Sequence, residues 1–194
     1  MNFRNPIYTE KTQCQDCYKC IRECPVKAIR VESGHAMVVP ELCVLCGHCV
    51  TICPAGAKRV RDDLSRARQL LTLKDRVIVS LAPSFASEFA GVEPARLVRA
   101  IKRLGFFGVS ETAIGADLVS AQVAEDFSAD PARRLFLSSA CPAAVEYVKR
   151  YMGELAPCII DRASPLLAHA RFLRESFGPD IGVVFVGPCI AKKR

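Results

Sequence analysis

The sequence predicts two folds in series, a small α+β module followed by an α/β domain with a mostly parallel sheet. Two observations support this. Within the first 60 residues, four cysteines and a proline recur at a constant offset, which indicates two copies of one small unit. From residue 76 onward, short apolar β-rich runs alternate with helical patterns, the order expected for a parallel sheet covered by helices.

Composition excludes several classes of protein. The 194 residues are 51% apolar and 24% charged, as in ordinary globular chains, and their longest apolar run is far shorter than the ~20 residues that cross a bilayer. The segment from Met1 to Gln13 lacks the apolar core of a secretory signal. We therefore expect a cytoplasmic protein that is not bound to a membrane. Eleven cysteines in such a chain favour metal binding over disulfides.

The repeat at the N-terminus has an offset of 29 residues. Its members are Cys14, Cys17, Cys20, Cys24 and Pro25, which recur as Cys43, Cys46, Cys49, Cys53 and Pro54. One copy is too short to bury a core of its own. Two copies around a pseudo-twofold axis can fold together if metal clusters occupy the middle.

The spacing C-x2-C-x2-C-x3-C-P is typical of 4Fe-4S proteins, in which the fourth cysteine of each run serves the other cluster. We therefore predict a two-cluster ferredoxin-like module over residues 1–60. Cluster 1 is assigned to Cys14, Cys17, Cys20 and Cys53, and cluster 2 to Cys24, Cys43, Cys46 and Cys49. A pair of zinc sites is the alternative, but four ligands suffice for each zinc and a regular third cysteine would then have no purpose.

Charge gives little support for a nucleic-acid partner. The formal charge of +7 counts the thiols as neutral, and two clusters, each −2 with its thiolates, bring it to about +3. Because the basic residues are scattered over predicted helices, we expect them to lie on solvated faces.

In the second half, residues 61–75 are expected to form a connecting helix, and residues 76–194 a separate domain. Ser164 with Pro165 marks a helix start, and Gly178 with Pro179 a helix stop. The expected strands lie at 77–83, 107–111, 135–142 and 181–189, and the expected helices at 94–106, 116–127, 143–152 and 164–178.

Ligands of open α/β sheets bind at the carboxyl ends of the strands. Three such ends carry the segments Ala82-Pro83-Ser84, Ala140-Cys141-Pro142 and Pro188-Cys189, which we expect at one edge of the sheet. Taken alone, Cys141 and Cys189 could also be small buried apolar residues at strand ends.

Residues 76–194 resemble the N-terminal part of the catalytic domain of iron-only, di-iron hydrogenases, which a two-cluster ferredoxin module often precedes. The matching segments are Ala82-Pro83-Ser84, Ala116-Asp117-Leu118, Ser138-Ser139-Ala140-Cys141-Pro142, Ser164-Pro165 and Gly187-Pro188-Cys189-Ile190-Ala191-Lys192-Lys193. The resemblance implies that Cys141 and Cys189 ligate an active-site 4Fe-4S cluster. It also implies that Lys192 holds a cyanide of the di-iron unit and that Ala82, Pro83 and Ser84 line its pocket.

The sequence departs from the family at the proton route. The proton-donating cysteine of the family signature T-S-C-C-P is Ala140 here, the relay serine falls on Ile160, and the nearer relay glutamate on Val123. The farther glutamate falls on Asp126, and Gly187 replaces the methionine of the second signature. A methyl group cannot relay protons. This pattern resembles the sensory branch of the family, so slow or absent hydrogen turnover is expected.

A second departure is that the sequence stops at Arg194, within the second signature, and lacks the third. Two thiolates cannot complete a four-ligand cluster. We therefore expect a fragment that is inactive alone, and we assign it no catalytic residue. In a complete protein, a third 4Fe-4S cluster with a di-iron unit is expected.

The preferred hypothesis is the N-terminal part of a sensory hydrogenase-like protein whose ferredoxin module transfers electrons. Its partner would be a redox protein or a downstream signalling domain, and neither nucleic acid nor membrane is expected. The alternatives are a self-standing ferredoxin-like electron carrier and an iron-sulfur assembly factor of the hydrogenase-like type.

Overall fold

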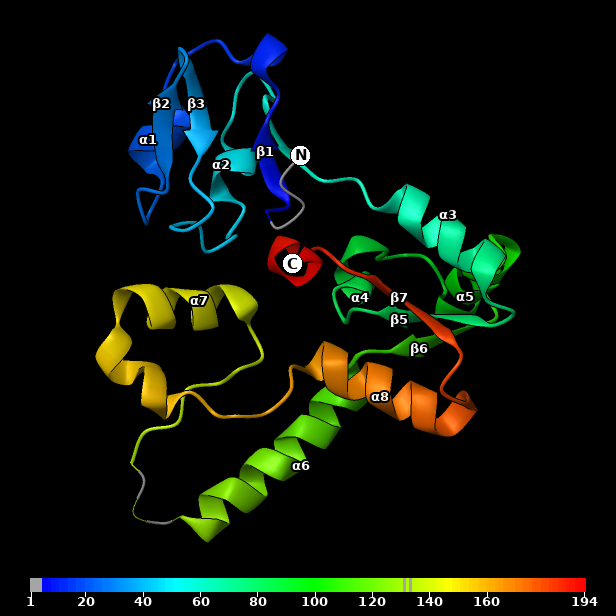
Figure 1. Ribbon diagram of the computed structural model, residues 1–194. Coiled ribbons are helices and arrows are strands. Elements are labelled where there is room, and N and C mark those ends of the chain that lie inside the picture. The colour runs from blue at the N-terminus through cyan, green and yellow to red at the C-terminus, as the bar shows by residue number, and fades with distance from the viewer. Residues whose placement is uncertain (1–4, 131, 133) are drawn as a thin grey trace. The chain divides into compact units, whose positions relative to one another are not determined.

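The computed structural model describes residues 5–130, 132 and 134–194 (Figure 1). The chain forms two compact units. Unit 1 contains the residues up to Asp62 together with Cys141–Pro157 and Cys189–Arg194, and unit 2 contains Asp63–Ala140 and Cys158–Pro188. Residues 1–4 lie outside the described part. They belong to the expected module 1–60 and to the segment Met1–Gln13 discussed above. In the described part, no helix combines the length and apolarity needed to cross a membrane.

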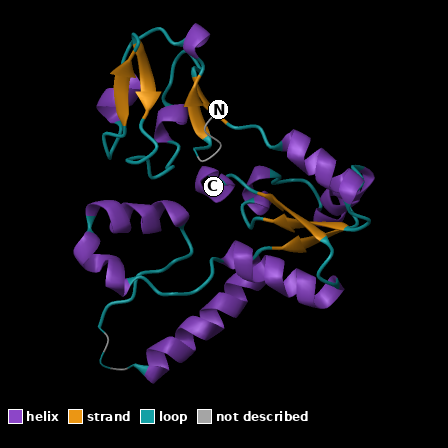
Figure 2. Cartoon of the chain, in the orientation of Figure 1, coloured by secondary structure: helices purple, strands orange, loops and turns teal. Residues whose placement is uncertain are grey.

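Unit 1 begins with two antiparallel strand pairs, seen as short arrows in Figure 2. Strand β1 (Ile7–Thr9) pairs with β4 (Lys58–Val60), and β2 (Ile29–Glu32) pairs with β3 (His35–Val38). A 3-10 turn, η1, follows β1. The helices and turns of this unit are η1 (Lys11–Gln13), α1 (Lys19–Glu23), α2 (His48–Thr51), α7 (Pro142–Tyr151), most of η2 (Gly153–Cys158) and η3 (Ile190–Lys193).

The 29-residue offset of the sequence is also the offset of the structure. Adding 29 to the residue numbers carries α1 onto α2, β1 onto β3 and β2 onto β4. Left-handed backbone positions follow the same rule, since Asp16, Tyr18 and Lys27 (φ 52°, 55° and 51°) correspond to Leu45, Gly47 and Gly56 (φ 60°, 81° and 61°). The buried core is small and includes Cys20, Cys24, Cys43 and Cys49. This is the ferredoxin-like fold that the repeat predicted.

Unit 2 is built on a parallel sheet of strand order β6-β5-β7, as predicted. Strand β5 (Val77–Leu81) is central and buried along its whole length, as expected for a strand with neighbours on both sides and helices on both faces. The flanking strands are β6 (Gly108–Glu111) and β7 (Gly182–Val186). The helices are α3 (Leu64–Leu73), α4 (Phe85–Glu88), α5 (Pro94–Arg103), α6 (Ala113–Ala129) and α8 (Pro165–Phe177).

The expected start and stop of α8 are both confirmed. The Ser164 hydroxyl accepts a hydrogen bond from the Leu167 N–H, and the helix ends at Gly178, whose φ of 99° lies in the left-handed region. On the inner face of α8, Leu173 packs against Ile78 and Ile181. Leu70 of α3 lies close to Gly182 and Val77. Because Val77 and Ile78 point to opposite faces of the sheet, α3 and α8 cover opposite faces.

The expected strand over 135–142 is wrong. Leu137 makes one isolated parallel bridge with Ile159, outside the three-stranded sheet. The serines that follow bind backbone groups: the Ser138 hydroxyl accepts from the nearby Ala140 N–H, and the Ser139 hydroxyl donates to the carbonyl of the distant Arg162. Such bonds compete with a strand ladder. Ala140-Cys141-Pro142 therefore does not follow a strand of the sheet, and the expectation that it would is corrected.

A buried polar network connects α8 to the sheet. The His169 ring is fully buried, and its Nδ1 and Nε2 atoms each lie 2.8 Å from a hydroxyl oxygen, of Ser80 and Ser110 respectively. Ser80 in turn contacts the hydroxyl of Thr112 (2.8 Å), which donates to the Leu81 carbonyl (3.0 Å). One proton arrangement gives each contact a single hydrogen: Ser80 donates to Thr112, Nδ1–H donates to Ser80, and Ser110 donates to Nε2. This requires a neutral imidazole, and burial lowers the pKa of His169 accordingly.

Helices α6 and α8 approach closely at Gly115. A Cβ atom there would overlap the Pro165 carbonyl oxygen and lie 2.7 Å from the Cβ of His169. We predict that Gly115→Ala lowers the free energy of unfolding of unit 2 by about 1–3 kcal/mol, because a methyl group inserted there forces the helices apart. Chemical denaturation followed by circular dichroism measures the change.

Gly108→Ala is the matched control, because Gly108 is in the same unit and a Cβ there meets nothing within 4 Å. We expect it to leave stability unchanged or slightly higher. Equal effects of the two variants would contradict the close packing of α6 on α8.

Candidate metal centres

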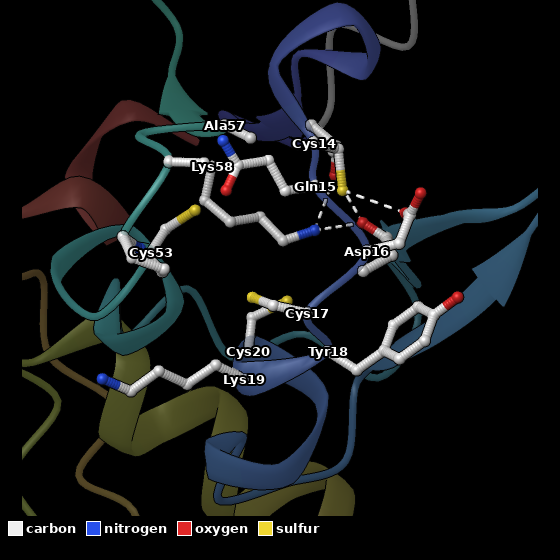
Figure 3. Close-up of a pocket in the computed structure, with 14 residues that line it drawn as sticks. Cys14, Gln15, Asp16, Cys17, Tyr18, Lys19, Cys20, Cys53, Ala57 and Lys58 are labelled. Carbon is white, nitrogen blue, oxygen red and sulfur yellow. Dashed lines mark hydrogen bonds between the residues drawn. The ribbon is translucent and has the colours of Figure 1, made fainter.

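The first cavity of unit 1 brings cysteines from both copies of the repeat together. Cys14 and Cys17 come from the loop before α1, Cys20 from the first turn of α1, and Cys53 from the loop after α2. Figure 3 shows their side chains around the cavity, with Lys58 extending from beside Cys53 toward Cys14. Four sulfurs around one cavity are a donor set that suits iron-sulfur clusters and zinc alike.

The second cavity has the same plan with the copies exchanged. It is lined by Cys43, Cys46 and Cys49 of the second run and by Cys24 of the first. This is the crossed grouping expected from the spacing of the cysteines. The remaining lining of this cavity is mainly apolar, with Ile7, Val38 and Val44 among its residues.

Left-handed residues make this arrangement of sulfurs possible. In the first run, Asp16 and Tyr18 alternate with the cysteines, and in the second run Leu45 and Gly47 do so. A left-handed residue between two cysteines reverses the chain locally, so that three nearby cysteines can face one centre. For Asp16, Tyr18 and Leu45 this conformation costs of order 1 kcal/mol each, which ligand binding has to offset.

Burial and backbone hydrogen bonds act in opposite directions on the thiols. Burial raises the pKa of Cys20 and Cys43, and it raises that of Cys49 to about 12. At Cys53, burial alone would raise the pKa, but the N–H groups of Lys58, Ala57 and Ala55, assisted by the Lys58 ammonium, hold it below its usual value. The Ala28 N–H likewise donates to the Cys24 sulfur at 3.2 Å. Such N–H···S bonds stabilise thiolates and tune a cluster bound to them.

Cys141 and Cys189 both belong to unit 1, with the ferredoxin-like repeat. Each stands at the N-terminus of an element, Cys141 before α7 and Cys189 before η3. Cys141 is exposed, whereas Cys189 packs at the edge of the unit 1 core. The two elements are joined by an ion pair in which the Arg194 guanidinium lies 2.8 Å from the Glu146 carboxylate.

Helix α7 holds the loop that leads into the second cysteine run. The Arg150 guanidinium donates to the carbonyls of Pro40, Glu41 and Cys43, at 3.2, 2.6 and 3.0 Å. The Tyr151 hydroxyl donates to the Leu42 carbonyl at 2.7 Å. The segment that carries Cys141 is therefore attached to the loop beside the second cavity.

Element η3 approaches the same cysteine run from another side. A Cβ at Gly47 would lie 2.6 Å from the Cδ1 atom of Ile190, so the absence of a side chain between Cys46 and Cys49 admits Ile190. Cys189 precedes Ile190 directly. Both predicted active-site cysteines thus adjoin elements that pack beside the second cavity, although neither lines it.

The other residues implied by the resemblance have different surroundings. Ala82 is buried and donates its N–H to the Val186 carbonyl at 2.9 Å, so the ends of β5 and β7 lie side by side as expected. Pro83 is exposed and Ser84 is half-buried, and Lys192 is half-buried in η3. At Gly187 a Cβ would lie 2.6 Å from the Phe185 ring and 2.7 Å from the Cβ of Ala82, so the ring fills the space that a methionine would need.

Comparison with known proteins identifies both parts of the chain. Residues 75–194 match the model for the C-terminal domain of the iron-only hydrogenase large subunit. The chain belongs to the iron-only hydrogenase family. Residues 13–58 of this hydrogenase-like protein match the 4Fe-4S dicluster domain, which together with the cysteine cavities supports bound iron-sulfur clusters.

Individual relatives agree with this assignment. The NADP-reducing hydrogenase subunit HndD of Solidesulfovibrio fructosivorans is 26% identical over 226 aligned residues, which cover 96% of this chain and 39% of HndD. The polyferredoxin-like subunit of an aliphatic sulfonate oxidoreductase of Pyrococcus furiosus is 40% identical over 50 residues, covering 25% of this chain and 28% of that one.

A solved [FeFe]-hydrogenase, studied for oxygen inactivation through modification and degradation of its H-cluster 2Fe subcluster, shares the fold. It has a TM-score of 0.53 at 24% identity, over 69% of this chain and 40% of that one. The hydrogenase-like protein thus spans about two fifths of the length of HndD and of this solved enzyme.

The crossed grouping of cysteines makes a specific prediction about which cluster each ligand serves. We predict that Cys24→Ser perturbs the cluster held by the second cysteine run and leaves the other cluster intact, because Cys24 lines the second cavity and not the first. Low-temperature paramagnetic resonance of the reduced protein, with the two signals resolved, measures the change.

The matched control is Cys53→Ser, the equivalent residue of the second copy, which lines the first cavity. It should perturb the opposite signal. The grouping is wrong if both variants alter the same signal.

Proposed function

We propose that this hydrogenase-like chain binds two 4Fe-4S clusters and transfers electrons between a redox partner and an active-site cluster of the hydrogenase type. The observation that carries the proposal is the pair of four-cysteine cavities in one unit, each completed by a cysteine from the other copy of the repeat. When bound, the clusters supply one-electron redox chemistry.

The residues of the chain hold and tune the clusters. Cys14, Cys17, Cys20 and Cys53 hold cluster 1, and Cys24, Cys43, Cys46 and Cys49 hold cluster 2. Backbone N–H groups donate to the sulfurs of Cys24, Cys43 and Cys53, which lowers the cost of adding negative charge. The apolar residues lining the second cavity limit the access of water.

Cluster 2 is the inner member of the proposed electron path. Arg150 and Tyr151 bind the loop before Cys43, and Ile190 packs against Gly47, so the segments bearing Cys141 and Cys189 are attached beside the second cavity. We propose that these two cysteines ligate the active-site cluster. Ala82, Pro83, Ser84 and Lys192 would then line the pocket of a di-iron unit, as the resemblance implies.

We further propose that the chain is of the sensory type, with slow or absent hydrogen turnover, in a cytoplasmic protein that signals to a redox partner or a downstream domain. The proposal is supported by side chains at the family's proton-relay positions. Ile160 is buried and apolar, Val123 is apolar, and the Asp126 carboxylate is bound by the Arg162 guanidinium at 2.5 and 2.9 Å. With Ala140, three of the four positions carry no transferable proton.

We predict that the chain reconstituted without oxygen binds about eight irons and eight sulfides, as two 4Fe-4S clusters require. Elemental analysis measures the metals, and reductive titration measures the electrons accepted. A variant with Cys17 and Cys46 both replaced by serine removes one ligand from each cavity and should lose most of the iron. Protein that binds chiefly zinc, or about four irons, would refute the proposal.

The sensory proposal predicts the rate of hydrogen turnover by a longer protein, in which the 194 residues are joined to a segment carrying the third family signature. Turnover should be slow, and Ala140→Cys should restore part of the rate, because a positioned acid or base contributes typically ~100-fold to 10,000-fold. Ile160→Ser with Val123→Glu should increase the rate further, beyond the product of the separate gains, since the relay positions act together. Hydrogen evolution with a reduced mediator measures the rates.

The control for this series is Ala100→Cys, because Ala100 is exposed on α5 and lies far in sequence from every relay position. Full activity with Ala140→Cys alone, or none with all three changes, would show that the proton route does not explain slow turnover.

A further inference from the structure

The two cluster cavities have identical cysteine spacing, but the other residues that line them differ. Under the 29-residue offset, Thr9 and Lys58 of the first cavity correspond to Val38 and Ile29 of the second. Both are cross-strand pairs in register, Thr9 with Lys58 between β1 and β4, and Val38 with Ile29 between β3 and β2. A polar, charged pair in one half thus replaces an apolar pair in the other.

Lys58 is buried, with 3% of its surface exposed. Its Nζ atom donates to the Thr9 hydroxyl at 2.6 Å and also to the Ala36 carbonyl, and the Thr9 hydroxyl donates to the same carbonyl at 2.7 Å. Both partners are neutral. None of the ion pairs within the described residues includes Lys58. Burying an ammonium without a paired anion costs free energy. A negative group placed nearby would offset that cost.

The charge of Lys58 is directed at the cysteines. Figure 3 places its side chain within the first cavity, between Cys53 and Cys14. Burial raises the pKa of Cys20, a ligand of cluster 1, and the Lys58 ammonium opposes this rise; it also helps to lower the pKa of Cys53, another ligand of cluster 1. The same ammonium opposes the rise in the pKa of Cys49, a ligand of cluster 2, but the Lys58 side chain lines the first cavity and not the second. A 4Fe-4S cluster with four thiolates gains one further negative charge on reduction, and a nearby buried cation stabilises that reduced state.

The carboxylate of Asp16 also lines the first cavity, but it is less able to act on a cluster. Its carboxylate lies 3.4 Å from the Cys14 sulfur and 3.3 Å from the Nδ1 atom of His35, but the side chain is 38% exposed. Water screens such a charge far better than the protein interior screens Lys58. Of the two charges that line the first cavity, the positive charge of Lys58 therefore acts more strongly on a bound cluster than the negative charge of Asp16.

We infer that Lys58 is a built-in positive charge that favours reduction of cluster 1, so that two clusters held by the same cysteine spacing have different potentials, with cluster 1 the higher. This inference rests on the proposed function, because it requires both clusters. An incoming electron would then reside mainly on cluster 1, in the first cavity. Cluster 2, beside the segments that carry Cys141 and Cys189, would have the lower potential.

The test is Lys58→Met, which removes the charge while keeping the length of the side chain. At a fixed potential near the midpoint of cluster 1, we expect the ratio of reduced to oxidised cluster 1 to fall at least tenfold, a shift of about 59 mV to more negative potential for one electron. Cluster 2 should shift less. Redox titration followed by paramagnetic resonance measures both, with Cys17→Ser and Cys46→Ser identifying the signals of clusters 1 and 2.

Lys19→Met is the matched control. Lys19 lines the same cavity and loses the same formal charge, but it is exposed, so water and salt screen it. Its shift should be much smaller and should vanish in high salt, whereas the Lys58→Met shift should persist. Should Lys58→Met bind less iron than the wild type, Lys58→Gln removes the charge while keeping a donor for Thr9 and Ala36.

The outcomes separate the two proposals. If the wild-type chain fails to bind about eight irons, the proposed function fails and the inference fails with it. If the wild type and a Lys58 variant both bind two clusters, and cluster 1 shifts no more than cluster 2 or no more than in Lys19→Met, the inference alone is overturned.

Discussion

Four cysteine sulfurs must converge on each of two cavities, and most of unit 1 follows from this requirement. The repeat has little apolar core of its own, and part of that core is cysteine. Left-handed residues between the cysteines, and the exchange of the fourth cysteine between copies, are the means by which so short a chain surrounds two centres. Because buried thiols such as Cys49, with a pKa of about 12, must lose protons to become ligands, cluster binding, proton release and folding are coupled in this unit.

Two exact copies of the repeat would surround two equivalent centres. The two copies differ, however, in the residues next to the cysteines. One half keeps an apolar cross-strand pair, and the other places Lys58 and Thr9 there. One half also has Gly47 where the other has Tyr18, and the missing side chain admits Ile190. The repeat thus sets the two cysteine cavities, and the departures from it make their surroundings different, as the proposed electron path with an outer and an inner cluster requires. A difference of this kind is what a chain of cofactors needs if electrons are to have a preferred position.

The cysteine grouping and the parallel sheet were predictable because both depend on local patterns: fixed spacings, β-rich runs such as Val77–Leu81, and the Ser164-Pro165 and Gly178 helix signals. The attachment of α7 was not, since Arg150 and Tyr151 bind backbone carbonyls, which every residue has. Scattered basic residues were expected on solvated faces, but Lys58 is buried, unlike the other lysines and arginines of the described residues. Its correspondence to the apolar Ile29 under the 29-residue offset was the available signal. The hydrogen-bond network of the buried His169 was not predictable either, because the fold of the sheet brings Ser80, Ser110 and Thr112 to it from distant positions in the sequence.

Unit 1 is assembled from three separate stretches of chain, so the chain passes between the units four times. This has a consequence for the order of events during synthesis. Protein chains emerge at roughly 5–20 residues per second. The two cysteine runs are therefore complete for several seconds before α7 has been made, and longer before Ile190 appears. During that interval, the loop from Pro40 to Cys43 and the backbone at Gly47 are still uncovered. The side of the module that α7 and η3 later cover is thus open to solvent for the time that the ribosome needs to make the intervening residues.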